Sequence, residues 1–282
     1  MKKLVVVLLV LLLPVPASAG SDAYADSEEH RMPADYEDVH THLKTGEGIK
    51  KYADGDDAGA QKNFGVQPVH DNEVFAVFSA DRFEYRTGDE DDILLWDVQA
   101  WVGEDYNKLW FESEGAWSVE AEKFEEVQTE LFYSRNIATF WDLRVGARHD
   151  FEPDPSRTFA ALGVQGLAPL WFEIDATIYL SEDGDLSAAL EAEYDLLLSQ
   201  RLILQPRFEA GAGSDEVREY GEGAGIRDIE LGVRLRYEIH RKFAPYIGVS
   251  WHRLLGETED FAEAAGKDTD TVSWICGVRF WF

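Results

Sequence analysis

The chain has 282 residues, of which 29% are charged, and its 55 acidic residues outnumber the 26 basic ones, giving a net charge of -29. This surplus excludes nucleic-acid binding, because contacts to phosphates need clustered lysine and arginine, and it favours cations or a basic partner. Cys276 is the single cysteine, so an intrachain disulfide is excluded as well.

Residues 1–19 have the three regions of a secretory signal peptide. Lys2 and Lys3 precede an apolar run at 4–13, and small residues follow up to Ala19. A retained membrane helix needs about 20 apolar residues, roughly twice the length of this run. We therefore predict cleavage after Ala19 and export from the cytoplasm.

Residues 20–71 are rich in Asp, Glu, Gly, Lys and Ala and have few large apolar side chains. They follow neither the period of a strand nor that of a helix over any long stretch. Such a composition cannot bury enough apolar surface to order itself. We predict a disordered, acidic arm in the periplasm.

From residue 72 to residue 282, apolar and polar residues alternate. In 170–181, LWFEIDATIYLS, Phe172 and Ile174 lie on one face while Glu173 and Asp175 lie on the other. A period of two indicates strands with one apolar and one charged face. Transmembrane strands need only about 9 to 11 such residues.

The charged faces distinguish a membrane barrel from a soluble sandwich. They carry too many charges for a soluble fold whose other faces are continuously apolar, whereas a membrane barrel turns its apolar face to lipid and lines its lumen with polar residues. We predict an antiparallel outer-membrane β-barrel of about twelve strands. The expected strands are 73–86, 93–103, 107–117, 125–135, 140–151, 157–167, 170–181, 185–196, 200–211, 227–239, 243–254 and 271–282.

Two further features agree with this architecture in a Gram-negative bacterium. With both termini in the periplasm, the outside loops are acidic and mostly long, and the inside turns are short. The final strand, TVSWICGVRFWF, ends on Phe282, and an aromatic end resembles the signal read by the outer-membrane insertion machinery. Lipid and that machinery are therefore expected partners.

Several segments of the predicted barrel resemble the copper resistance protein B family of bacterial outer-membrane proteins. The resemblance implies a role in copper tolerance, by sequestering copper ions or assisting their passage outward, with periplasmic copper-handling proteins as partners. The segments that carry it are LLWDVQAWVGEDYNKLWFESEG (94–115), LFYSRNIATFWDLRVGARHDF (131–151), GVQGLAPLWFEIDA (163–176), QRLILQPR (200–207) and DIELGVRLRYEIHRKFAPYIGVSW (228–251).

The arm departs from the family, whose members commonly carry many methionines and histidines there. This arm holds one methionine, Met32, together with His30, His40, His42 and His70. His40 and His42 lie on the same side of an extended chain, and imidazole suits Cu(II), whereas a methionine sulfur suits Cu(I). We name these five residues as candidate copper ligands; the alternative is a solvated linker.

The lumenal charges admit two interpretations, a cation path or ion pairs that fill the barrel. Opposite charges stand close together in some strands, as in Arg148 and Asp150, which favours pairing. Glu191, Glu193 and Asp195 have no cation in their own strand, so we name them as a second candidate cation site. A general cation-selective pore is the alternative function.

A lipid-acting enzyme is the third possibility. Ser250 and His252 share one face of a predicted strand, but a serine nucleophile needs a base within hydrogen-bond reach and an orienting third group. The sequence offers no evident third group. We therefore expect no enzymatic activity.

Overall fold

The computed structural model describes residues 73–88 and 91–282. The predicted signal peptide, the arm at 20–71 and the start of the barrel at residue 72 lie outside these residues. No helix in the described part of the chain has the length and apolar character of a membrane span.

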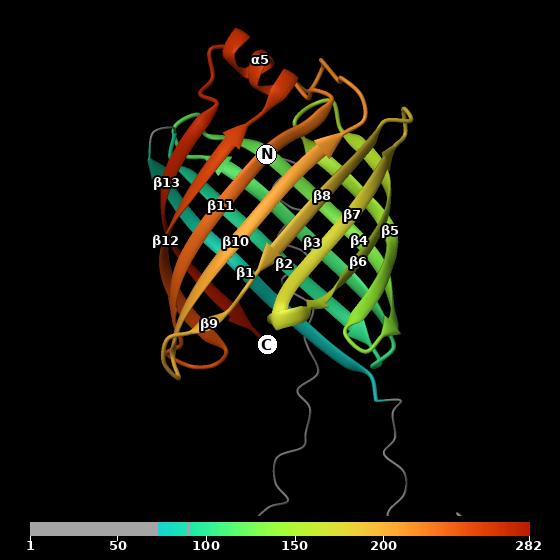
Figure 1. Ribbon diagram of the computed structural model, residues 1–282, viewed down its shortest axis with the longest axis vertical. Coiled ribbons are helices and arrows are strands. Elements are labelled where there is room, and N and C mark those ends of the chain that lie inside the picture. The colour runs from blue at the N-terminus through green and yellow to red at the C-terminus, as the bar shows by residue number, and fades with distance from the viewer. Residues whose placement is uncertain (1–72, 89–90) are drawn as a thin grey trace, which may run out of the picture. The chain divides into compact units, whose positions relative to one another are not determined.

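The described residues form one antiparallel sheet that is closed on itself (Figure 1), so the predicted fold is confirmed. Neighbouring strands in sequence pair with each other, as in an up-and-down barrel. The strands are β1 (Phe75–Gly88), β2 (Ile93–Gly103), β3 (Asn107–Ser118), β4 (Lys123–Ala138), β5 (Trp141–Glu152), β6 (Arg157–Ala168), β7 (Phe172–Ser181), β8 (Leu186–Glu193), β9 (Leu196–Leu197), β10 (Leu202–Gly213), β11 (Gly225–Tyr237), β12 (Phe243–Leu254) and β13 (Asp270–Trp281).

The short strand β9 continues β8 along the same edge of β10, so the two count as one strand of the barrel. Both pair with β10, with Glu193 opposite Arg207 and Leu196 opposite Leu204. With β8 and β9 counted as one, the described residues form a barrel of twelve strands, which is the predicted number. The observed bounds differ from the expected ones by a few residues at most.

The barrel closes where β1 meets β13. Tyr85 lies opposite Cys276 in this pairing, and the chain end adds two backbone hydrogen bonds. The amide of Phe282 donates to the carbonyl of Phe78 at 2.8 Å, and the amide of Phe78 donates back at 3.2 Å. Closure leaves the sheet without a free edge, as a bilayer requires.

The alternation along each strand separates the two faces of the wall. On β7, Ile178 is 56% exposed on the outside, whereas its neighbours Thr177 and Tyr179 are buried inside. Cys276 is exposed on the outer face of β13, between the buried residues Ile275 and Gly277. The outer wall is thus apolar and the lumen is polar.

The connections divide into a loop end and a turn end. We call the side of 153–156, 182–185, 214–224 and 255–269 the loop end, and the side of 104–106, 139–140, 169–171, 198–201 and 238–242 the turn end. A short 3-10 helix, η2 (Pro169–Trp171), forms one of the turns. The chain ends at the turn end, opposite α5 (Gly256–Ala264; Figure 1).

The helix α5 was not predicted from the sequence. Glu257 and Glu259 lie in its first turn, where negative charge interacts favourably with the helix dipole. The Thr258 hydroxyl accepts a hydrogen bond of 2.9 Å from the amide of Gly223, which joins α5 to the loop at 214–224. Glu222 of the same loop forms an ion pair of 3.1 Å with Arg157, the first residue of β6.

We predict that deleting Phe282 impairs assembly more than Phe282→Ala does. The deletion removes both backbone hydrogen bonds to Phe78, whereas the alanine variant removes only the ring. The measurement is the heat-modifiable fraction in the outer membrane on a gel. If both variants assemble like the natural chain, the terminal residue is not needed for closure or for insertion.

Candidate functional site

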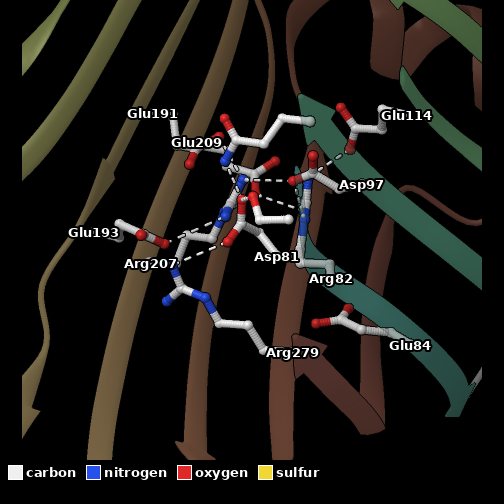
Figure 2. Close-up of polar contacts among 12 residues, drawn as sticks. Asp81, Arg82, Glu84, Asp97, Glu114, Glu191, Glu193, Arg207, Glu209 and Arg279 are labelled. Carbon is white, nitrogen blue, oxygen red and sulfur yellow. Dashed lines mark hydrogen bonds and ion pairs between the residues drawn. The ribbon is translucent and has the colours of Figure 1, made fainter. Parts of the chain in front are cut away.

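The lumen is where the barrel gathers its charged side chains. A bulge in β1 helps to place them, because Ala80 pairs with Val98 and Arg82 with Asp97, leaving Asp81 as an extra residue. Both Asp81 and Arg82 then reach lumenal partners, as Figure 2 shows. Asp81 binds Arg279 of β13 at 3.0 Å.

Arg82 connects opposite parts of the wall. Its Nε donates to Asp97 at 3.0 Å, its Nη2 to Glu114 at 2.5 Å and its Nη1 to Glu209 at 3.0 Å (Figure 2). Glu209 lies on β10, which is separated from β1 by β11, β12 and β13. The side chain of Arg82 is only 4% exposed, so this bridge passes through the interior of the barrel.

Arg207 continues the bridge on the other side. It donates to Glu209 and Glu191, lies 3.4 Å from Glu193, and approaches Asp97 at 3.9 Å (Figure 2). The guanidinium has several planar donors, so one arginine can contact several carboxylates. Arg82 and Arg207 thus share Glu209 and Asp97 between them. We call these two arginines and their carboxylates the central bridge.

The acidic residues named from the sequence therefore have cations, but on neighbouring strands. Glu193 is paired with Arg207 in the β8–β10 register, and Arg207 also contacts Glu191. Asp195 contacts Arg236 of β11. The charge pattern within single strands could not show these partners. Pairing the expected strands 185–196 and 200–211 as a hairpin could have indicated Arg207. The three acids are thus divided between two ion-pair groups.

A second group of charges lies around Arg144 on β5. This arginine contacts Glu112 of β3 and Asp175 of β7, each two strands away. Its guanidinium carbon also lies 4.0 Å from the centre of the Phe132 ring, a cation–π contact. The in-strand pairing of Arg148 and Asp150 is present at 2.6 Å.

Among the charged residues that the structure describes, Glu84 is the most deeply buried, with 1% of the residue exposed. Arg234 donates to it at 2.6 Å, Arg86 at 2.9 Å and the Tyr246 hydroxyl at 3.0 Å. Gly277 makes room for Tyr246, because a Cβ at this glycine would lie 2.6 Å from the tyrosine ring. The negative charge of Glu84 is therefore compensated inside the barrel by two arginines and a hydroxyl group.

The described lumen offers no evident site for a metal ion. No group of three or more His, Cys, Asp or Glu residues suited to a metal ion occurs within residues 73–88 and 91–282. The candidate copper ligands His30, Met32, His40, His42 and His70 lie outside the described residues. His252 Nε2 lies 3.9 Å from Asp228, which is beyond hydrogen-bond distance.

We predict that Arg82→Met strongly destabilises the barrel, because it leaves Asp97, Glu114 and Glu209 with less compensation. Removing one partner of a buried ion pair costs about 3 to 5 kcal/mol in the free energy of unfolding. The matched control is Arg218→Met, whose side chain is 79% exposed and whose loss should cost about 0.5 kcal/mol or less. Guanidinium unfolding in detergent measures both, and equal midpoints would contradict a stabilising role for the central bridge.

Comparison with known proteins identifies the relatives. The family model described as copper resistance protein B precursor matches residues 74–282. Copper resistance protein B of Escherichia coli is 38% identical over 273 residues, covering 94% of this chain and 91% of the relative. The copper resistance protein B homolog of Pseudomonas syringae pv. tomato is 35% identical over 268 residues, covering 95% and 90%.

Among solved structures, the NanC porin matches with a TM-score of 0.48 and 13% sequence identity, covering 73% of this chain and 99% of the porin. The family assignment does not depend on that match. It follows from the family model and from the two relatives, which extend over nearly the whole chain. The chain belongs to the copper resistance protein B family.

Proposed function

We propose that the protein contributes to copper tolerance by sequestering copper at the outer membrane, with the arm as the copper-binding part and the barrel as its anchor. The family supports the role in copper tolerance, and the barrel fold supports the outer membrane. We place the turn end and the arm in the periplasm, where copper-handling proteins could exchange the metal with it.

The central bridge is the observation that favours sequestration over a general cation pore. Arg82 and Arg207 join carboxylates of β2, β3, β8 and β10 across the lumen. A hydrated cation crossing the barrel would have to displace these pairs, and separating a buried pair is costly. The acids of the bridge are also already engaged by arginine, which competes with any metal for their oxygens.

The arm carries several nitrogen and sulfur donors close together in sequence, whereas the described residues contain no group of three or more His, Cys, Asp or Glu suited to a metal ion. His40 and His42 stand two residues apart, and neutral imidazole is a better donor for Cu(II) than carboxylate. His30, Met32 and His70 add further nitrogen and sulfur donors. Copper is the cargo of this arm rather than a cofactor of a reaction. We propose no enzymatic role for Ser250 and His252.

Copper affinity of the full-length protein should depend on the histidine pair. His40→Ala with His42→Ala should weaken Cu(II) binding at neutral pH more than Asp35→Ala with Asp38→Ala, which removes two nearby carboxylates from the same arm. Binding should also fall as the pH drops through about 6.5, where free imidazole gains a proton. Calorimetry measures all three proteins, and equal affinities would exclude the histidine pair as ligands.

Survival in copper should require the arm as well as the barrel. A deletion strain complemented with the protein lacking residues 20–71, but keeping its signal peptide, should be more sensitive to copper than one with the full-length protein. Outer-membrane levels of both proteins, compared on a gel, provide the control. Full protection by the arm-deleted protein would contradict sequestration by the arm.

A further inference from the structure

The outer wall of the barrel contains an apolar groove of about 650 Å³. The residues that line it come from six neighbouring strands, so the groove runs across the strands rather than along one of them. Cys276 and Gly277 lie in it. Its apolar lining includes Phe83, Leu94, Leu202, Leu235, Ile247 and Val278.

The groove arises from the sizes of side chains in neighbouring rows of the sheet. Ile247, Cys276 and Tyr85 are directly opposite one another on β12, β13 and β1, and Pro245 is opposite Val278 in the next row. Cys276, Pro245 and Val278 are small compared with the aromatic residues Phe83, Tyr85 and Tyr237, which also line the groove. The depression they leave faces the hydrocarbon of the membrane, because it lies on the apolar face of the wall.

Basic side chains stand beside one end of this groove. Leu202 and Tyr237 pair at the turn end, and the turns that adjoin them carry Arg201, Arg241 and Lys242. The two turns are joined by a hydrogen bond of 2.8 Å from the amide of Glu238 to the carbonyl of Arg201. Figure 1 shows both turns at the end of the barrel opposite α5.

These three basic residues differ from the arginines of the lumen. All three are exposed, and none forms an ion pair within the described part of the chain. Lys242 instead lies 4.9 Å above the ring of Trp281, the last residue of β13 at the turn end. In a chain with a net charge of -29, a group of cations without ion pairs among residues 73–88 and 91–282, next to an apolar groove, indicates an anionic, amphipathic ligand.

We propose that this groove binds one anionic phospholipid, with an acyl chain in the groove and the phosphate at Arg201, Arg241 and Lys242. The size of the groove is within the range of ligand sites, about 300 to 1,000 Å³. The choice of a phospholipid over lipopolysaccharide rests on the periplasmic orientation of the turn end proposed above. The site itself requires neither copper nor the arm.

Native mass spectrometry of the full-length protein in detergent tests the site, with added phosphatidylglycerol, phosphatidylcholine or lipid A as probes. The natural protein should retain one phosphatidylglycerol in preference to phosphatidylcholine. The variant Arg201→Gln, Arg241→Gln and Lys242→Gln should lose this preference by at least fivefold, about the effect of one charge near a membrane surface. Its control changes three other exposed cations that form no ion pair with another described residue, Lys123→Gln, Arg135→Gln and Lys267→Gln.

Filling the groove tests the position of the acyl chain. Cys276→Trp should abolish retention of phosphatidylglycerol, whereas Ile178→Trp on the outer wall of β7 should leave it unchanged. Val278→Trp serves as a second groove variant if the first does not fold.

The proposal is overturned if the glutamine and groove variants retain lipid like the natural protein, or if the control variants lose it equally. Preference for lipid A would also overturn it, and would contradict the orientation. Copper binding and copper survival are measured separately, so a failure of this site leaves sequestration by the arm standing.

Discussion

A sheet that crosses a bilayer can leave no row of backbone amides unpaired, and the pairing of β1 with β13 satisfies this constraint here. Closure forces each strand to place alternate side chains in lipid and in the lumen. The charged residues of the chain must therefore collect inside or at the two ends. The rest of the structure, including the dense ion pairing of the interior, follows from that division.

Burying charge inside the barrel is stable only if the charges are matched. Arginine suits this task, because its donors reach several carboxylates at once, as Arg82 and Arg207 do. The same matching restricts function. Carboxylates bound to arginine are poor metal ligands, and in the function proposed above the side chains that meet across the lumen obstruct it. The ion pairs therefore favour the proposed role of the barrel as an anchor over a role as a general passage for ions.

The strands were predictable from the sequence because alternation is a local property, visible in segments such as 170–181. Charge partners on other strands were not. Glu191 and Glu193 have no cation nearby in sequence, and their contact with Arg207 depends on the register of β8 with β10. The helix α5 was also missed, because its stability depends on contacts with the loop at 214–224. The groove beside Cys276 depends on side chains from six strands, which no single segment reveals.

The central claim is that paired charges obstruct the lumen, so that the barrel is not a general cation pore. Conductance of the full-length protein across a planar lipid bilayer tests it most directly. The account predicts no steady cation current in the natural protein and a measurable current in Arg82→Ala with Arg207→Ala, which removes both arginines of the central bridge. A steady current through the natural protein, independent of copper, would contradict it.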